Sequence, residues 1–364
     1  MVFDISQKSA TIAVLIGRFQ PFHNSHLAML QAALQLASQV VVVLGSAYQA
    51  RTPKNPFTWQ ERAAMITASV SASQALRVRY LPMRDYYDES RWVAAVHTGV
   101  HNMVQEITSA ETRIVLLGHF KDDSSRYLAR FPHWQLHDLP RLGPCDATSI
   151  RAEYWAASAT EVQQQLTEQV PVPVQQWLTN WMRSPATAPT YAAMQQEWLA
   201  LSAYQRAWAC APYPPVFVTV DALVLCAGHV LLVQRAHWPG KDLWALPGGF
   251  LEPTDTLWQS CIRELREETA LPLAEQTLQA ALQGVEVFDH PTRSQRGRTV
   301  THVHVIHLPD MNLPQVQGGD DAGAAGWVAL PSLAEMEARM FEDHFHVLRR
   351  CFERFGTGTD ITFF

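Results

Sequence analysis

Apolar residues in the first third of the chain form short runs that alternate with segments of helical spacing. The runs typical of buried strands lie at 11–16, 40–44, 77–81 and 114–117, and the predicted helices lie at 26–36, 56–70 and 89–107. Three of these strands end at a glycine, namely Gly17, Gly45 and Gly118. Alternation of this kind predicts an α/β fold with a parallel sheet that binds ligands at the carboxyl ends of its strands.

The pattern changes between residues 155 and 215. This stretch is rich in Gln, Ala and Trp, and four prolines interrupt it before the Pro-Tyr-Pro-Pro segment at 212–215. Because proline ends helices, we expect short helical hairpins that join two domains. The predicted organisation is a first domain at 1–185, a helical linker at 186–212 and a second domain at 213–364.

The second domain begins with two strand-like runs, at 216–225 and 229–234, joined by the hairpin signal Ala227-Gly228. A strongly charged helical segment follows near residue 260. Further strands are expected at 284–288 and 299–308, and a closing helix at 333–355.

Composition places the chain among ordinary globular proteins, with 48% hydrophobic and 17% charged residues over 364 positions. No apolar run approaches the roughly 18 residues of a membrane span, and the N-terminus lacks a signal-peptide layout. The five cysteines are scattered and form no C-x-x-C pair, which favours a reducing cytoplasm and argues against a structural zinc site.

The charge is unevenly distributed along the chain. Residues 1–185 hold 16 Lys and Arg against 14 Asp and Glu, whereas the remainder holds 12 against 20. The two parts therefore carry net charges of +2 and −8. An acidic second half suits a site that loads a metal ion and disfavours a surface that binds nucleic acid.

Three glutamates of the charged helix, Glu264, Glu267 and Glu268, stand at i, i+3 and i+4 and so share one face. A bound divalent cation would offset their repulsion, because Mg²⁺ prefers oxygen ligands and bridges to phosphates. Arg263 is placed to pair with Glu267 and to reach back to Asp255. The alternative is a solvated acidic face. The neighbouring Gly248-Gly249 pair, at which the backbone can approach a metal or a phosphate, favours the metal site.

The segment from Gly249 to Leu271 resembles the Nudix box, with Asp255 in place of the usual Glu and Ala270 in place of the usual Gly. The resemblance implies an α/β/α Nudix domain that hydrolyses a diphosphate with the help of Mg²⁺. The implied metal ligands are Gly249, Glu264, Glu267 and Glu268. The general base stays open between Glu264 and the two aspartates Asp320 and Asp321.

The stretch from Gly17 to His26 follows the first predicted strand and opens the first predicted helix. The free N–H groups of a helix N-terminus bind anions, and His23 and His26 can face the same phosphate. The stretch resembles the H-x-G-H motif of the nucleotidyltransferases, with Ser25 in place of Gly, and in particular the archaeal-type nicotinamide mononucleotide (NMN) adenylyltransferases. That resemblance implies a Rossmann-like domain.

Later segments match the same family in order. Residues 55–62 resemble its D/N-P-F-T-x-x-E-R stretch, and 147–151 resemble its S-x-T-x-x-R motif, with Asp146 in place of Ser. The family holds the nicotinamide at the positions of Asp85 and Trp92, although a surface Asp and a core Trp are equally good interpretations of each alone. The implied catalytic residues are Arg18, His23, His26 and Arg151, and the implied ATP- and NMN-binding residues are Gly17, Phe19, Gly45, Asp85, Trp92, Gly118, Lys121, Asp122, Thr148 and Ser149.

The loop at 287–298 carries three arginines, whose planar guanidinium groups suit phosphate, next to a phenylalanine that can stack on a base. A solvated hairpin tip is the alternative. The stretch resembles the corresponding loop of Nudix enzymes that cleave ADP-ribose to AMP and ribose 5-phosphate. The ADP-ribose-binding residues implied in this way are Phe288, Arg293, Arg296 and Arg298.

Over its whole length, the chain resembles the bacterial bifunctional NMN adenylyltransferase/Nudix hydrolases. The resemblance implies Mg²⁺, or alternatively Mn²⁺, at both sites, and ATP, NMN, NAD and ADP-ribose as partners, with neither nucleic acid nor membrane. Homo-oligomerisation stays open. The rival hypotheses are a Nudix-like regulator that senses ADP-ribose and a nucleotidyltransferase with another acceptor, such as nicotinate mononucleotide.

Overall fold

The computed structural model of the protein describes residues 10–108, 112–118, 129–140, 145–158, 161–309 and 312–356. The chain divides into two compact units, Met1–Gln195 and Gln196–Phe364. The division falls inside helix α8 (Ala188–Ala207), within the stretch that the sequence predicts as a helical linker.

Unit 1 is built on a five-stranded parallel sheet with the order β3-β2-β1-β4-β5. The strand order reverses between β1 and β4, which is where open α/β sheets bind their ligands. The parallel sheet predicted from the alternating pattern is confirmed. The short polar strand β5 was not predicted, because its pattern lacks buried positions. The strands are β1 (Ala10–Gly17), β2 (Gln39–Leu44), β3 (Val78–Pro82), β4 (Thr112–Gly118) and β5 (Gln135–Asp138).

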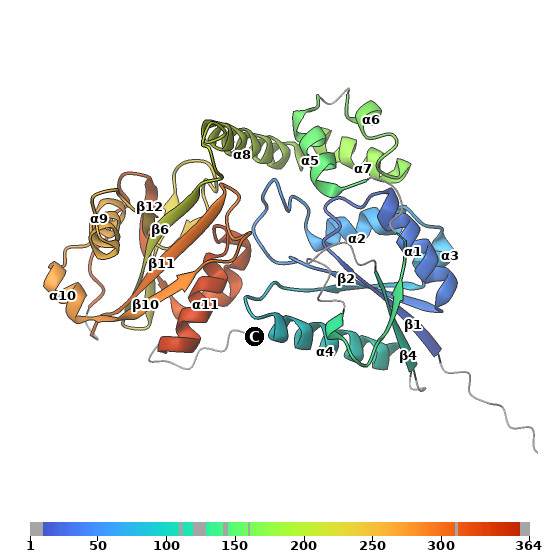
Figure 1. Ribbon diagram of the computed structural model, residues 1–364, viewed down its shortest axis with the longest axis horizontal. Helices are drawn as coiled ribbons and strands as arrows, with labels where there is room; N and C mark the ends of the chain where they lie inside the picture. The colour runs from blue at the N-terminus through green and yellow to red at the C-terminus, as the bar shows by residue number, and fades with distance from the viewer. Residues whose placement is uncertain are drawn as a thin grey trace, which may run out of the picture. The chain divides into compact units, whose positions relative to one another are not determined.

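Helices cover both faces of this sheet (Figure 1). Helix α4 buries Val96, Val100 and Val104 against one face, and α1 covers the other. Helix α2 is shorter than predicted because Thr58 caps its N-terminus by accepting from the backbone N–H of Glu61. The helices are α1 (Asn24–Leu36), α2 (Trp59–Ala68), α3 (Ala72–Ala75), α4 (Glu89–Ile107), α5 (Ala147–Ala156), α6 (Val162–Gln165) and α7 (Val172–Arg183).

Unit 2 contains a mixed sheet with the order β10-β11-β6-β7-β12, to which β8 and β9 add at β7 and β6. Strands β6 and β11 run parallel, and the other pairs are antiparallel. Strand β12 was not predicted, because its Ala- and Gly-rich sequence lacks a strand pattern. The strands are β6 (Val216–Cys226), β7 (His229–Arg235), β8 (Trp244–Ala245), β9 (Gly248–Phe250), β10 (Leu282–Phe288), β11 (Arg298–His307) and β12 (Ala322–Ala329).

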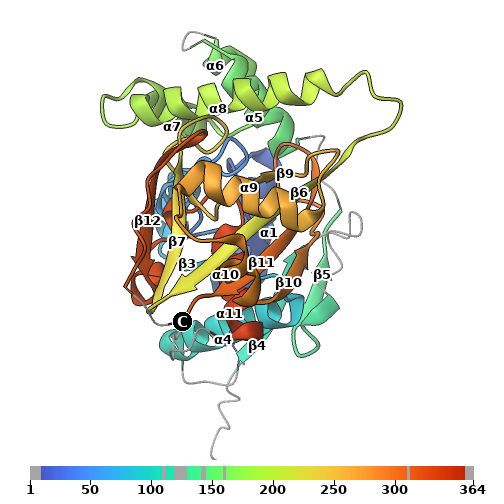
Figure 2. The ribbon, with the colours of Figure 1, turned by 90° about the vertical axis from the view of Figure 1, so that its left-hand side faces the viewer.

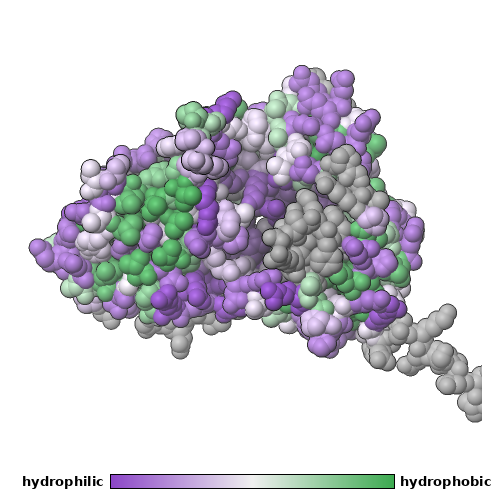
Figure 3. All heavy atoms as spheres, viewed as in Figure 1, coloured by the Kyte–Doolittle hydropathy of each residue, from purple (hydrophilic) through white to green (hydrophobic). Residues whose placement is uncertain are grey.

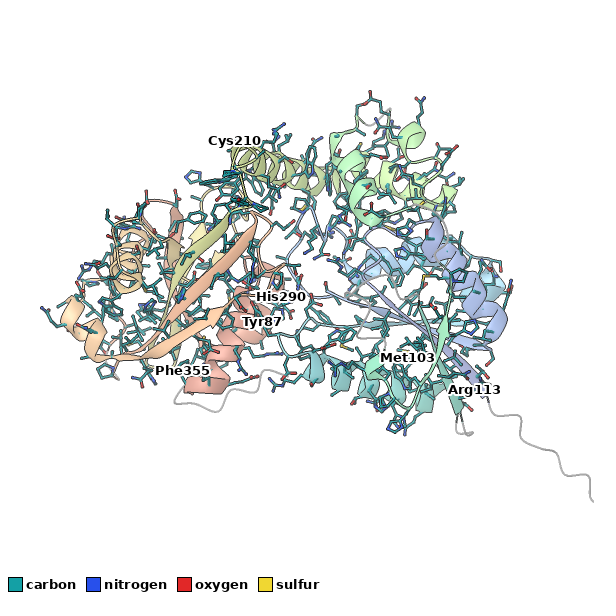
Figure 4. All side chains as sticks on the ribbon, in the orientation of Figure 1. Tyr87, Met103, Arg113, Cys210, His290 and Phe355 are labelled. Atoms are coloured by element: carbon teal, nitrogen blue, oxygen red, sulfur yellow. The ribbon has the colours of Figure 1, made fainter. Side chains whose placement is uncertain are left out.

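The sheet of unit 2 lies between helices α9 (Leu257–Thr269) and α11 (His344–Phe355), which gives the predicted α/β/α layering (Figure 1). Figure 2 looks onto the face that α9 covers, where Cys261, Ile262 and Leu265 join the core. The short helix α10 (Glu275–Ala280) follows α9. Phe355, at the end of α11 (Figure 4), packs against Gly284 of β10.

The closing helix predicted at 333–355 is interrupted. Two short 3₁₀ helices, Leu330–Glu335 and Glu337–Arg339, precede α11. Glu342 adopts a left-handed conformation (φ 44°), which a continuous helix cannot contain.

The described surface includes exposed apolar side chains on the strands of unit 2. Val216 is 60% exposed, and Val285 and Val287 of the edge strand β10 are 39% and 50% exposed. Figure 3 shows apolar surface, in green, over the strands of this unit. None of the helices in the described ranges combines the length and the hydropathy that crossing a bilayer requires.

Candidate active sites

The first candidate site lies at the carboxyl ends of β1 and β2. The two strand ends are joined by a hydrogen bond from the backbone N–H of Gly45 to the carbonyl oxygen of Gly17 (3.0 Å). After Gly17 the chain turns through Phe19 in a left-handed conformation (φ 53°) and enters α1, for which His23 is the N-cap. The predicted strand–loop–helix setting of this segment is therefore present.

His23 and His26 meet at the start of α1. Their rings are stacked with centroids 3.5 Å apart and an interplanar angle of 21°. The backbone N–H of His23 donates to Nδ1 of His26 (3.4 Å). Because Nδ1 accepts, the neutral ring carries its proton on Nε2, which is left to donate to an anion. Nδ1 of His23 is buried and has no hydrogen-bond partner among the described residues, which suits a site that receives a polar ligand.

Burial keeps both imidazoles neutral in this arrangement. It lowers the pKa of His23 to about 4, against the opposing attraction of Asp146. It also lowers the pKa of His26 well below its ordinary value, with the charge of His23 as a further cause. The two rings therefore act as hydrogen-bond donors at neutral pH, and an incoming phosphate would favour their protonated forms.

Three guanidinium groups gather around the same loop. Arg151 donates from Nη1 to the carbonyl oxygen of Gln20 (2.6 Å) and from Nη2 to the hydroxyl of Thr148 (3.3 Å). Burial and the nearby charge of Arg18 lower the pKa of Arg151 to about 10. Burial, with a smaller contribution from Arg18, also lowers the pKa of Arg62 to about 10. Arg62 is buried against the backbone, so Arg18 and Arg151 are the two cations of this group that suit a polyphosphate.

Arg62 was not predicted as a site residue. It is fully buried in α2 and binds the backbone of the phosphate loop. The signal that could have indicated it is its position at the end of the 55–62 motif, where a charge stands in an otherwise apolar helix face.

Thr148 and Ser149, with Asp146 before them, lie at the N-terminus of α5, where Thr148 accepts from Arg151; their predicted role in ATP binding stays a prediction. The Asp146 carboxylate caps the helix by accepting from the backbone N–H of Thr148 (2.8 Å). It also accepts from the hydroxyl of Ser149 (2.5 Å), so that this hydroxyl is already engaged.

Asp85 and Trp92, which are predicted to bind the nicotinamide of NMN, have different surroundings. Asp85 accepts from the backbone N–H and hydroxyl of Ser46 (3.3 and 2.7 Å) and from the side-chain amide of Gln49 (2.7 Å). Trp92 is half-buried and meets Phe131 edge-on, with centroids 6.3 Å apart. Gly118 ends β4 as expected, whereas Lys121 and Asp122 lie outside the described residues.

The second candidate site is built on α9. Its N-terminus is capped by Thr256, and its C-terminus is closed by Ala270 in a left-handed conformation (φ 49°, ψ 29°). Ala270 therefore keeps the backbone that glycine usually supplies at this position.

Arg263 organises the loop before the helix. It forms ion pairs with Glu267 (2.7 Å), Glu264 (2.9 Å) and Asp255 (3.7 Å), so the predicted pairings with Glu267 and Asp255 are confirmed. Asp255 also accepts from Ser260 (3.0 Å) and so stays tied to the first turn of α9 despite its short side chain.

Glu268 and Glu264 form the buried part of the acidic face. Glu268 is 6% exposed and accepts from the backbone N–H of Gly248 (2.9 Å). Burial raises its pKa to about 8, and the nearby Glu264 adds to the shift. Burial also raises the pKa of Glu264, to which Asp320 contributes. Each shift reports a carboxylate that a cation would stabilise.

The oxygen donors of these side chains suit a divalent cation in chemistry. A Cβ at Gly249 would lie 2.3 Å from Oε1 of Glu264, so only glycine lets the backbone approach this carboxylate. Within the described ranges, no three His, Cys, Asp or Glu side chains are already arranged to hold a metal ion. The carboxylates of Glu264 and Glu267 are both paired with Arg263.

The predicted arginine loop extends from the end of β10 and contains His290 (Figure 4). Arg293 is buried and donates twice to the carboxylate of Asp343, at the start of α11 (2.9 Å each). Arg298 donates to the carbonyl oxygen of Asp289, and Phe288 is only 4% exposed. The contribution of these three residues to ADP-ribose binding stays a prediction.

Arg296 is the arginine of this loop that lies near β9. Its guanidinium lies over Phe250, which follows Gly249, at 5.1 Å, and over Phe341 at 5.8 Å. Arg235, at the end of β7, lies over Phe341 at 4.3 Å and is close enough to Glu268 for their charges to interact. Sequence reasoning missed Arg235, because a lone arginine at a strand end carries no distinctive pattern.

Comparisons with known proteins match both units. The family model for the NUDIX domain matches residues 216–351, and the cytidylyltransferase-like model matches residues 14–80. The nicotinamide/nicotinic acid mononucleotide adenylyltransferase of Acinetobacter baylyi is 40% identical over 149 residues, covering 41% of this chain and 77% of that protein. The ADP-ribose pyrophosphatase of Methanocaldococcus jannaschii is 31% identical over 130 residues, covering 35% of this chain and 72% of that protein.

A solved structure matches nearly the whole chain. The bifunctional NMN adenylyltransferase/ADP ribose pyrophosphatase of Francisella tularensis is 35% identical, with a TM-score of 0.86 over 95% of this chain and 100% of that one. A second structure of the Francisella protein contains AMP and a manganese ion. The similarity in fold and sequence to this relative therefore covers both units. The chain belongs to the family of bifunctional NMN adenylyltransferase/ADP-ribose pyrophosphatases.

Proposed function

We propose that unit 1 transfers the adenylyl group of ATP to NMN, giving NAD and pyrophosphate, and that unit 2 hydrolyses ADP-ribose to AMP and ribose 5-phosphate. The observation that carries the proposal is that each unit gathers, in one place, the charged side chains its reaction needs. The alternative of an ADP-ribose-sensing regulator loses support, because the relatives matched by both units are named as enzymes.

In unit 1, a phosphate oxygen of NMN attacks the α-phosphorus of ATP, and the bond from that phosphorus to the bridging oxygen of the β-phosphate breaks. The protein forms no covalent bond in this reaction, so positioning and charge stabilisation supply the catalysis. Arg18, His23, His26 and Arg151 are the groups suited to the developing negative charge. The hydrogen bond to Nδ1 of His26 supports its role, because it leaves the Nε2–H free to donate.

Asp85 is the residue that we propose selects the acceptor nucleotide. Ser46 and Gln49 hold its carboxylate in place. A carboxylate accepts from the amide N–H of nicotinamide and repels the carboxylate of nicotinate. Nicotinate mononucleotide is the second candidate acceptor, because the Acinetobacter baylyi relative is named for both nucleotides.

In unit 2, the carboxylates of Glu264, Glu267 and Glu268 and the carbonyl oxygen of Gly249 would hold the divalent cation. When bound, Mg²⁺ would acidify a water molecule and offset the charge of the diphosphate. Mn²⁺ suits the same oxygen donors. Arg296 and Arg235 are the proposed diphosphate-binding cations, since both guanidinium groups lie over the Phe341 ring, their charges interact with each other, and that of Arg235 also interacts with Glu268.

The proposal is tested by incubating the purified full chain with ATP, Mg²⁺ and either NMN or nicotinate mononucleotide, and separately with ADP-ribose and Mg²⁺. Chromatography with mass detection should show NAD and pyrophosphate in the first reaction, and AMP with ribose 5-phosphate in the second. Failure to form a dinucleotide from either acceptor contradicts the first activity. Intact ADP-ribose after incubation with Mg²⁺ and with Mn²⁺ contradicts the second.

A further inference from the structure

Arg62 is a buried cation whose hydrogen-bond partners, among the described residues, are backbone carbonyl groups. Its side chain is 0% exposed. Nη1 donates to the carbonyl oxygens of Arg18 (2.6 Å) and Gly45 (2.7 Å), and Nη2 donates to that of Ser46 (3.4 Å). Burying a guanidinium is costly, so a position that uses one needs several acceptors in a fixed arrangement.

The carbonyl groups that Arg62 binds flank two strained residues. Phe19 follows Arg18 and has φ 53°, and Ser46 follows Gly45 and has φ 50°. Both side chains are buried. Residues other than glycine rarely adopt this conformation and persist in it only where the surroundings impose it. A single guanidinium therefore holds the left-handed turns that end two neighbouring strands, β1 and β2.

Each strained turn carries a different half of the site. At the β1 end, the carbonyl oxygen of Gln20 receives Arg151, and the Phe19 ring lies edge-on to His26 with centroids 4.7 Å apart. At the β2 end, the N–H and hydroxyl of Ser46 hold Asp85. The planar fork of Arg62 joins these halves through its hydrogen bonds to backbone carbonyl groups, and its charge also interacts with that of Asp85.

We infer that Arg62 is a positioning residue for adenylyl transfer. Through its hydrogen bonds to the backbone, it fixes the position of the phosphate-binding loop relative to the Asp85 carboxylate, which is proposed to select the acceptor. This inference rests on the proposed activity of unit 1. Lysine preserves the charge but cannot present a planar fork to carbonyl groups on two strands. Loss of the guanidinium group should allow both left-handed turns to relax. The phosphate-binding loop and the Asp85 carboxylate should then both be displaced.

The test compares full-length Arg62→Lys and Arg62→Met with the matched control Arg77→Lys. Arg77 also donates to backbone carbonyl oxygens, those of Leu34, Ala37 and Ser38, but it does so at the amino ends of β2 and β3. For Arg62→Lys we expect kcat for NAD formation to fall on the order of a hundredfold, because small displacements of reacting groups carry that penalty. The preference for NMN over nicotinate mononucleotide should fall as well. Arg77→Lys should change neither, and ADP-ribose hydrolysis should stay normal in all variants.

Unchanged kcat and acceptor preference in Arg62→Lys would overturn the inference. An equal loss of NAD formation in Arg77→Lys would also overturn it, because the effect would then be one of general stability. A crystal structure of the Arg62 variants separates this inference from the proposed activity. If the wild-type chain forms no dinucleotide, the proposed function fails, and relaxation of Phe19 and Ser46 to negative φ still supports the positioning role. Retention of both left-handed conformations contradicts that role whatever the activity.

Discussion

The hydroxyl of Ser149 donates to the carboxylate of Asp146 over 2.5 Å at the N-terminus of α5. Asp146 also caps this helix and interacts electrostatically with His23 and Arg151. A carboxylate therefore stands among the groups proposed to bind the phosphates of ATP, and it occupies one of their hydroxyl donors.

Asp146→Ser is expected to lower KM for ATP. Serine still caps the helix, whereas the negative charge is removed and the Ser149 hydroxyl is released to a phosphate oxygen. Initial rates of NAD formation at varied ATP and saturating NMN measure the effect. A higher KM would mean that the carboxylate assists ATP binding, for example through a cation that accompanies the nucleotide.

His26→Ala is expected to reduce kcat for NAD formation on the order of a hundredfold or more, the usual loss when one donor to a developing charge is removed. ADP-ribose hydrolysis in the same preparation serves as the control and should be normal, since it belongs to the other unit. Wild-type turnover in a folded His26→Ala protein would exclude His26 from catalysis.

Asp85→Asn is expected to weaken the preference for NMN over nicotinate mononucleotide, because it removes the charge proposed to repel the nicotinate carboxylate. Competition between the two acceptors, read from the ratio of products, measures this preference. Asp88→Asn is a matched control, since Asp88 is an exposed helix cap that accepts from the N–H groups of Ser90 and Arg91. If both variants keep the wild-type ratio, acceptor choice is made elsewhere.

Glu268→Gln is expected to lower ADP-ribose hydrolysis by orders of magnitude while NAD formation stays near normal. A neutral amide is a poor ligand for Mg²⁺, yet its oxygen can still accept from the backbone N–H of Gly248. Without metal, the melting temperature should hold or rise, because a buried carboxylate beside Glu264 is lost. Glu275→Gln, on α10, is the control. If Glu268→Gln hydrolyses ADP-ribose at the wild-type rate, the acidic face of α9 has no catalytic role.

Ala270→Gly is expected to stabilise unit 2, because glycine removes the steric cost of roughly 1–2 kcal/mol that the left-handed conformation imposes on Ala270, and the greater entropy of the unfolded glycine chain offsets only part of this gain. Chemical denaturation followed by a probe in unit 2 measures the change. Ala281→Gly is a suitable control, since Ala281 ends α10 with negative φ and should lose stability on the same change. Destabilisation by Ala270→Gly would show that its Cβ contributes packing that outweighs the strain.

The local patterns were sufficient for most of the fold. Strands β1–β4, helices α1, α2 and α4 and the acidic face of α9 were predicted, because burial periodicity and helical spacing act over a few neighbouring residues. The Arg263 pairings with Glu267 and Asp255 were predictable for the same reason, since these partners lie within two turns of one helix and its preceding loop. Strands β5 and β12 were missed, because their polar or Ala- and Gly-rich sequences carry no such periodicity.

By itself, the sequence determined the α/β character of the chain. It also determined the two motifs expected to act on phosphate groups, at 17–26 and 249–271, and the family that they resemble. Each of these features depends on residues close together in the chain. Only the tertiary structure decided which charged groups from distant segments meet. Arg293 is bound by Asp343, 50 residues away, and Arg62 lies buried against the ends of β1 and β2 rather than at a surface. Such partnerships depend on the geometry with which distant segments pack, since a buried cation takes whichever acceptors the fold brings within hydrogen-bond distance.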